Sequence, residues 1–249
     1  MKINNKILPI VGILTFLLLW WFVKLFFFSE SNYLSSPIET FTNLFDLLVN
    51  KNLLKDFSAT FQKFAFGFLL AILIGIPLGI ILGINKQIYK SVEVLLDFFR
   101  SIPVTTLFPL FILFYGISSK TIIAMVFIAC VFVIILNTSY GVFYTKPSYI
   151  SYLKSLKATK YQIFTNAILP SSLPFIFIGL RISVSFALIV VIVAEMFIGS
   201  NYGLGTRVYE SYETYLITDV YSIILFVGII GYLMNKLFAV LEKRIIHWK

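Results

Sequence analysis

Two charged side chains interrupt the long apolar run at residues 173–198. Arg181 and Glu195 stand 14 positions apart, which on a helix is about 21 Å of rise and about 40° of rotation, so they share a face without touching. A charge at the centre of a membrane span costs about 2.5–3.5 kcal/mol and is therefore a candidate for a function. Two interpretations are open for each. Arg181 lines a polar pathway or extends to the head groups, and Glu195 lines the mouth of that pathway or braces the loop at 199–205.

Pro103 and Asn137 complete the set of candidate pathway residues. A proline inside a span removes a backbone donor, and such breaks are tolerated where neighbouring helices or a water-lined cavity satisfy the freed carbonyl. Pro103 and Pro109 interrupt the run at 92–115, which makes this segment either a wall of the pathway or a helix with a plain kink. Asn137 is a polar side chain near the end of the run at 121–143.

Residues that usually perform catalysis or bind metals are scarce in this sequence. His247 is the only histidine and Cys130 the only cysteine, so neither a two-cysteine redox pair nor a cysteine-based metal site can form. The chain contains no Gly-x-x-x-x-Gly-Lys-Ser/Thr, no His-Glu-x-x-His and no Gly-x-Ser-x-Gly, the motifs of nucleotide binding, zinc peptidases and serine hydrolases. We therefore expect no enzyme activity, no metal and no cofactor in this chain.

The composition predicts that helices embedded in lipid position these residues. Hydrophobic residues make up 59% and charged residues 12% of the 249 residues, and the mean hydropathy is +0.96. Runs of about 20 apolar residues cross a bilayer as helices, because backbone groups in lipid must bond within their own segment. The sequence predicts an all-α polytopic membrane protein with about six transmembrane helices, at 7–28, 58–84, 92–115, 121–143, 173–198 and 219–241.

The positions of lysine and arginine predict the orientation in the membrane. The net charge of +9 could indicate nucleic-acid binding, but the basic residues form short clusters between apolar runs, so we expect no nucleic-acid partner. These clusters lie in the amino terminus, in the turn at 86–90, in the loop at 144–172 and in the carboxyl tail. By the positive-inside rule these segments, and with them both termini, are cytoplasmic. Residues 29–57 then form an external loop with a short interfacial helix, and a mixed external loop follows the fifth run.

Small residues recur at every fourth position of the second run. They are Gly67, Ala71, Gly75, Gly79 and Gly83. Such a stripe lets two helix backbones approach closely in lipid, where no hydrophobic effect drives helices together. Glycine is frequent in membrane helices in general, but five small residues in register favour a helix-packing face.

The loop at 144–172 carries lysines and no acid. Apolar residues at spacings of three and four predict two short helices in it. Ser148 is expected to cap the first helix after Pro147, and Pro170 and Pro174 are expected to end the second. A short apolar stripe beside lysines can lie on the membrane surface or dock into a groove on a cytoplasmic partner.

Most of this loop resembles a motif of a known family. From Ser151 the chain reads Ser-Tyr-Leu-Lys-Ser-Leu-Lys-Ala-Thr-Lys-Tyr-Gln-Ile-Phe-Thr-Asn-Ala-Ile-Leu-Pro, which resembles the Glu-Ala-Ala coupling loop of binding-protein-dependent ABC importer permeases. The matching positions are Tyr161, Phe164, Leu169 and Pro170. The chain departs from the pattern at 151–153, where Ser-Tyr-Leu replaces Glu-Ala-Ala, and at Lys157, which replaces a glycine.

Further short motifs extend the resemblance over most of the chain beyond residue 55. They are Gly75-Ile76-Pro77-Leu78-Gly79, Arg100-Ser101-Ile102-Pro103, Gly179-Leu180-Arg181-Ile182, Ala194-Glu195-Met196 and Gly203-Leu204-Gly205. The first two look like the second and third spans of the family. The last three are similar to the branch that imports sulfonates, taurine, nitrate and related small solutes, and thiamine-precursor and riboflavin importers share these signatures.

The resemblance implies a type I importer permease fold in the bacterial plasma (inner) membrane. It implies a homodimer around one pathway, two cytoplasmic ABC ATPase subunits that hold the 144–172 loops, and an extracytoplasmic solute-binding protein. Residues 1–57 would then be a first helix with its external loop, and 58–249 the permease core. The residues expected to seat the loop on the ATPase are Leu153, Lys154, Leu156, Lys157, Ala158 and Phe164; a helix that touches only anionic lipid is the alternative.

A secondary transporter or channel, which needs no ATPase, is the alternative function for the whole chain. Intramembrane acids forming a proton relay would favour it, and only Glu195 is available for such a relay. A structural membrane subunit or membrane enzyme is a further possibility, but no group of residues in the sequence supports it.

Overall fold

The computed structural model describes residues 8–29, 31 and 33–247, and every regular element in these ranges is a helix. The all-α fold expected from the composition is therefore confirmed. In chain order the elements are α1 (Leu8–Phe27), α2 (Pro37–Val49), α3 (Leu53–Ile84), α4 (Lys86–Ser101), the 3-10 turn η1 (Val104–Leu107), α5 (Phe108–Tyr115), α6 (Ser119–Phe143), α7 (Pro147–Ser155), α8 (Lys160–Ile163), the π turn η2 (Phe164–Ile168), α9 (Leu169–Ile198), α10 (Leu204–Glu213) and α11 (Ile217–Ile245).

Five helical segments of the described chain are long and apolar enough to cross a membrane. They are α1, α3, α6, the continuous segment from α8 to α9, and α11, and they coincide with five of the six predicted runs. The count reaches six when α4, η1 and α5 are taken together as one broken span.

The third predicted span is not one kinked helix. α4 ends at Ser101, and the chain continues into η1 and α5 with a bend of 83°. Pro103 lacks a backbone donor and disfavours the helical conformation in the residue before it. Ile102 is accordingly extended, with φ −73° and ψ 121°, so the helix breaks here instead of bending slightly.

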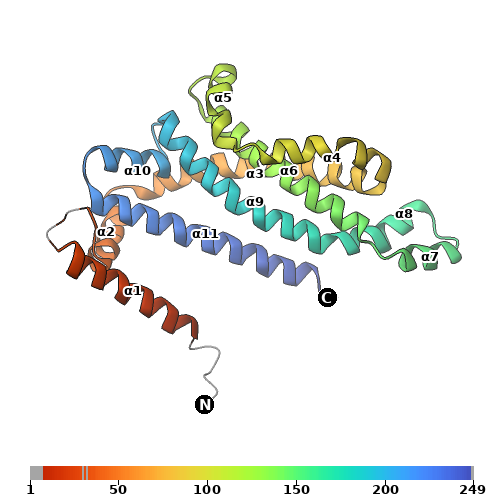
Figure 1. The fold of residues 1–249 in the computed structure, drawn as a ribbon, viewed down its shortest axis with the longest axis horizontal. Coiled ribbons are helices and arrows are strands. Elements are labelled where there is room, and N and C mark those ends of the chain that lie inside the picture. Colours follow the sequence, from red (N-terminus) through yellow and green to blue (C-terminus); the bar gives the residue numbers. More distant parts are fainter. Residues whose placement is uncertain (1–7, 30, 32, 248–249) are drawn as a thin grey trace, which may run out of the picture.

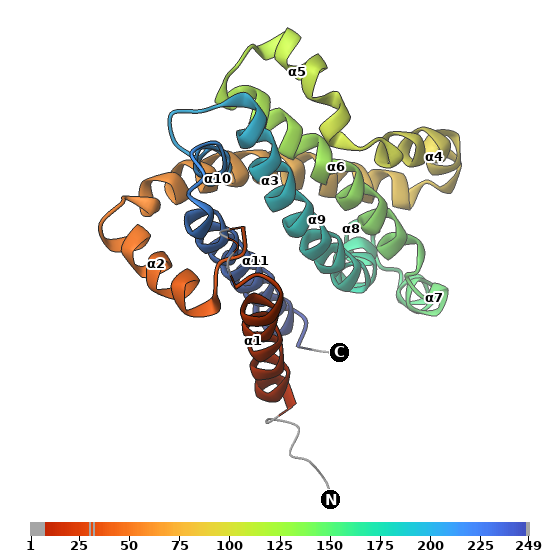
Figure 2. The same cartoon turned by 60° about the vertical axis from the view of Figure 1, so that its left-hand side comes forward.

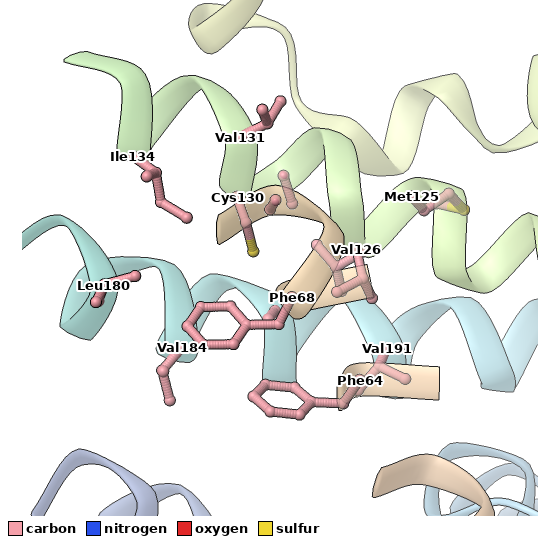
Figure 3. Close-up of a cluster of buried hydrophobic side chains, with 14 of the residues drawn as sticks. Phe64, Phe68, Met125, Val126, Cys130, Val131, Ile134, Leu180, Val184 and Val191 are labelled. Atoms are coloured by element: carbon pink, nitrogen blue, oxygen red, sulfur yellow. The ribbon is translucent and has the colours of Figure 1, made fainter. Parts of the chain in front are cut away.

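The core of the fold is a layer of three long helices, α3, α6 and α9, with α11 packed beside α9 (Figures 1 and 2). Their facing side chains form one buried cluster (Figure 3). It includes Phe64 and Phe68 from α3, Val126 and Cys130 from α6, and Val184 and Val191 from α9. Because many other apolar side chains remain exposed on these helices, the fold suits a lipid solvent better than water.

The small residues of α3 lie against α6. A Cβ atom added at Gly79 would lie 2.5 Å from Cβ of Thr138, and one at Gly83 would lie 2.5 Å from Cβ of Val142. Gly67 and Gly75 meet Val126 and Ile134 in the same way. The numbers rise together along both helices, so α3 and α6 run parallel, and the missing side chains set the distance between them.

Replacing Gly79 by alanine is expected to destabilise the protein by about 1–3 kcal/mol, since the added methyl group overpacks the contact with Thr138. The measurement is the thermal unfolding midpoint of the detergent-purified protein. Gly228→Ala in α11 is the control, because nothing lies within 4 Å of the added Cβ there. Equal midpoints for the two variants would contradict a packing role for Gly79.

α1 stands apart from the core (Figures 1 and 2) and buries none of its residues. The Trp20 indole donates to the carbonyl of Ser35 at 3.0 Å, which ties α1 to the segment before α2. The interfacial helix expected within 29–57 corresponds to α2, which packs on α11. Asn43 of α2 donates to Asp219 of α11 at 2.9 Å.

The prediction that Pro170 and Pro174 end the second loop helix is wrong. α8 continues through η2 into α9 as one segment of 39 residues, Lys160–Ile198. Pro170 falls in the first turn of α9, after the wider π turn, and Pro174 lies inside the helix. Prolines are tolerated at such places in membrane helices because local π adjustments and neighbouring groups satisfy the freed carbonyls.

The external loop expected after the fifth run contains a helix, α10, that the sequence does not predict. α10 is polar on average, but Leu204, Val208 and Ser211 form a buried face at helical spacing. Leu204 and Val208 join a second apolar cluster with residues of α2, α3 and α11. A helix this short and polar gives no hydropathy signal, and its packing partners decide that it forms.

Candidate functional sites at the two ends of the helices

A buried ion pair joins α3 to α9 at the end of the bundle that carries α10. Nζ of Lys63 lies 2.8 Å from Oε1 of Glu195, and both side chains are almost fully enclosed. The same ammonium group donates to Oγ of Ser200 and to the carbonyl of Tyr202, each at 3.1 Å. Lys63 therefore uses its donors on α9 and on the loop that leads to α10.

The carboxylate of Glu195 also holds the start of α10. The hydroxyl of Thr60 donates to Oε2 of Glu195 at 2.8 Å and accepts from the backbone N–H of Leu204 at 2.8 Å. The backbone N–H of Gly205 donates to the same carboxylate oxygen at 3.0 Å. Free N–H groups at a helix start favour an anion, and here the anion comes from another helix.

The position of Gly205 leaves no room for a side chain. A Cβ atom there would collide with the carbonyl oxygen of Ile192 and lie 2.8 Å from Cβ of Glu195. Gly203 is equally close, with its virtual Cβ 2.6 Å from the Glu195 carboxyl carbon. The two glycines thus let the backbone approach the carboxylate closely enough to donate to it.

A second acidic residue continues the network toward the surface. Oδ1 of Asp56 accepts from the backbone N–H of Gly203 at 3.1 Å, and Oδ2 lies 3.8 Å from Arg207. Beside them is a hollow of about 200 Å³. Basic side chains on its wall, those of Lys51, Lys55 and Arg207, outnumber the acidic ones, those of Asp56 and Glu210.

The sequence identifies Glu195 as a candidate but does not identify its partners. Of the two interpretations offered for Glu195, the enclosed geometry corresponds to the brace of the 199–205 loop. Lys63 could have been identified as Arg181 and Glu195 were, because it is a charged residue near the start of a long apolar run. Thr60 and Asp56 gave no signal, since polar residues near a helix end are common.

The other candidate pathway residues do not lie around Glu195 in the structure. Arg181 is exposed and lies 3.6 Å from Glu242 of α11. The amide of Asn137 donates to the carbonyl of Val133 in its own helix at 2.8 Å, and its side chain packs on Gly179. Pro103 stands at the break before η1. Within one copy of the chain these four side chains form no common site.

The break after α4 borders a different hollow, of about 260 Å³. Thr105 and Thr106 of η1 supply its polar groups, and no carboxylate lines it. Apolar side chains of α6 and α9, including Met125, Val193 and Phe197, form the remaining wall. The hydroxyl of Thr106 already donates to the carbonyl of Pro103 at 2.7 Å, whereas a hydroxyl such as that of Thr105 can donate a hydrogen bond to a small polar solute.

The loop at 144–172 forms the site at the opposite end. The expectation that Ser148 caps its first helix is wrong. The cap position of α7 is Lys146, with Pro147 at the first helical position and no side-chain cap bond. The second helix has a capping box, in which Thr159 and Gln162 each accept from the other's backbone N–H. Proline at the first helical position has no backbone N–H, so the start of α7 has one fewer unpaired donor that a capping side chain would have to satisfy.

The turn between α7 and α8 has a left-handed residue where the coupling-loop pattern has a glycine. Lys157 has φ +55°, and the N–H of Ala158 donates to the carbonyl of Leu153 at 3.0 Å. The lysine therefore adopts the conformation that glycine adopts easily, at a cost of about 1–2 kcal/mol. Leu156 is 60% exposed, whereas Phe164 is half-buried.

A layer of long apolar helices, a broken span and, at one end, two short helices joined by a lysine-bearing turn define a multi-pass membrane protein. Residues 75–247 match the family model described as "Binding-protein-dependent transport system inner membrane component". The chain belongs to this family and is the permease subunit of an ABC importer.

Curated relatives are similar over nearly the whole chain. The bicarbonate transport system permease protein CmpB of Synechococcus elongatus is 28% identical over 98% of this chain and 91% of its own length. The nitrate import permease protein NrtB of Synechocystis is 28% identical over 96% of this chain and 88% of its own. A probable ABC transporter permease of Brucella abortus is 29% identical over 87% of this chain and 86% of its own.

A solved structure supports the fold. An inward-facing form of the MetNI methionine ABC transporter contains a chain that aligns with a TM-score of 0.59, at 23% identity over 81% of this chain and 95% of its own length. The type I permease fold expected from the resemblance is therefore confirmed.

Proposed function

We propose that this permease passes a small inorganic anion of the bicarbonate or nitrate class across the membrane. The observation that carries the proposal is the similarity, over nearly the full length, to permeases named for bicarbonate and nitrate. The hollow beside η1 supports it, because Thr105 and Thr106 line that hollow and no aspartate or glutamate does. In addition, no acidic residue occurs between Asp97 and Glu195, so most of α4 to α9 does not repel an anion.

The solute is delivered and driven by separate chains in this proposal. An extracytoplasmic binding protein supplies the anion, and two ABC ATPase subunits hydrolyse ATP in the cytoplasm. Two copies of the permease, surrounded by lipid, form one pathway between them. Both termini and the 144–172 loop face the cytoplasm, as the lysine distribution predicts. Residues 58–249 form the permease core, and 1–57 add a peripheral helix and its external segment.

The experiment is uptake of isotope-labelled bicarbonate and of nitrate by proteoliposomes that contain the permease and its ATPase. The binding protein is added outside and ATP is enclosed. Uptake of either anion that requires both the binding protein and ATP supports the proposal. ATP-dependent uptake of a sulfonate or of a thiamine precursor, without uptake of either anion, would contradict the proposed substrate class and identify another one. Uptake without the ATPase would identify a secondary transporter or channel.

The roles that we assign to the two ends of the bundle differ. At the α10 end, Glu195 and Lys63 fix the corner between α9 and α10, and the pathway runs beside η1. At the other end, the exposed Leu156 and the lysines around it seat the permease on the ATPase. The support is that Glu195 is enclosed by partners, whereas Leu156 is exposed on a protruding segment (Figure 1).

Replacing Leu156 by asparagine is expected to weaken retention of the ATPase about tenfold or more. The change removes an apolar contact of about 1.5–3 kcal/mol without adding a charge. Co-purification of the ATPase from detergent measures the effect. Ser148→Asn, in the helix α7 that ends just before Leu156 and also exposed, is the control. Unchanged retention with Leu156→Asn would remove the docking role of this side chain.

A further inference from the structure

The segment that we assign to ATPase contact carries charge of one sign only. Residues 98–194 contain no aspartate or glutamate. Four lysines, Lys146, Lys154, Lys157 and Lys160, lie within 15 positions of the sequence, and all four are exposed. Among the residues that the structure describes, none of these lysines forms an ion pair with a carboxylate.

The fold concentrates this charge instead of spreading it. α7 and α8 lie together beyond the ends of α6 and α9 (Figure 1), and Lys154, Lys157 and Lys160 follow one another through the turn that joins them. The left-handed conformation of Lys157 reverses the chain there. Like charges held close together repel one another, and a partner of opposite charge relieves that repulsion.

Large side chains stand exposed among the lysines. Tyr149, Tyr152, Leu156 and Tyr161 are 51%, 64%, 60% and 75% exposed. Tyrosine is enriched at protein interfaces because its ring is apolar and its hydroxyl still bonds. An apolar anchor ringed by aromatic and cationic groups matches a protein groove, whose walls supply both packing and fixed carboxylates.

We propose that the ATPase groove that receives α7 and α8 is acidic, with carboxylates on its rim that pair with Lys154, Lys157 and Lys160. Leu156 fills the apolar floor of that groove. This inference rests on the proposed function and specifies the chemistry of the partner at the same site. The charge pairs set the rate and specificity of association, so the permease discriminates against ATPases with a basic groove.

The test uses the full-length permease in nanodiscs of zwitterionic lipid, together with the ATPase that co-purifies with it. Ser155→Cys provides an exposed thiol for crosslinking, since the native Cys130 is buried, and the crosslinked peptides locate the groove. Affinity is then measured for Lys154→Glu/Lys160→Glu at about 50 mM and about 500 mM KCl, across which the Debye length falls severalfold. Lys86→Glu/Lys90→Glu has the same charge change on α4 and is the matched control.

We expect the double variant at positions 154 and 160 to bind at least about tenfold more weakly in low salt, with the deficit shrinking in high salt. Lys154→Gln/Lys160→Gln should fall between it and the wild type. Replacing crosslinked groove carboxylates by lysine should restore binding of the glutamate variant. The control should bind like the wild type.

Two results would overturn this inference while leaving the importer function intact. One is an affinity that neither salt nor charge reversal changes. The other is an effect of the lysines that appears only with anionic lipid in the nanodisc, which would assign them to the membrane surface. Failure of the wild-type permease to retain any ATPase would instead contradict the proposed function itself.

Discussion

Replacing Lys63 by methionine is expected to destabilise the protein by about 3–5 kcal/mol. The substitution leaves the carboxylate of Glu195 buried without its counter-charge, and breaking one side of a buried ion pair costs this much. Three hydrogen bonds from the ammonium group, to Glu195, Ser200 and Tyr202, are lost together. The thermal unfolding midpoint and the yield of monodisperse protein in detergent measure the effect.

The double variant Lys63→Met/Glu195→Leu separates the ion pair from the packing. Replacing both charges by apolar groups of similar volume is often neutral or stabilising. The double variant should therefore recover much of the stability that Lys63→Met loses, although the N–H of Gly205 and the hydroxyl of Thr60 then lack an acceptor. Lys55→Met, an exposed lysine on the same helix, should change little. A single Lys63→Met variant as stable as the wild type would contradict the prediction.

Glu195→Gln distinguishes a brace from a pathway residue. The amide keeps the shape but leaves Lys63 charged and without its carboxylate, so stability should fall. If Glu195 only braces the corner, the remaining folded protein should transport with an unchanged apparent KM. An altered KM at normal stability would assign Glu195 to the pathway.

Replacing Gly205 by alanine is the second change with a large expected effect. The added Cβ collides with the carbonyl oxygen of Ile192 and crowds the Glu195 side chain. The start of α10 must then move away, which breaks the hydrogen bond from the Gly205 N–H to Glu195. Overpacking and the unsatisfied buried groups together cost about 2–6 kcal/mol.

The measurement for Gly205→Ala is the yield of folded protein and its unfolding midpoint, with the uptake rate as a second readout. Gly228→Ala is the matched control, because the added methyl group there meets open space. A folded, fully active Gly205→Ala variant would show that the start of α10 tolerates displacement, and the bracing role of the network would then be lost.

The broken span shows which structural features a sequence pattern can predict and which it cannot. The two prolines identify an interruption, and the residue before Pro103 is indeed extended. The pattern does not supply the angle, since the 83° bend depends on how η1 and α5 pack on α6. The same reasoning explains Pro170 and Pro174, which were expected to end a helix and instead lie within one, because the preceding π turn and the packed neighbours accommodate them.

The sequence by itself determined that the chain is a membrane protein, where five of its spans lie and to which family it belongs. These features depend on local properties, namely hydropathy over about 20 residues and short motifs. The stripe of small residues on α3 likewise needed only the helical repeat.

The tertiary structure alone decided which groups Glu195 contacts. Its partner Lys63 is 132 positions away, and no spacing rule relates two residues so far apart. The N–H groups that Glu195 and Asp56 accept from belong to the start of a helix that hydropathy does not reveal. A charged residue within an apolar run predicts that a partner is present, because the cost of desolvating the charge must be offset. Which residue is that partner depends on the packing of α3, α9 and α10.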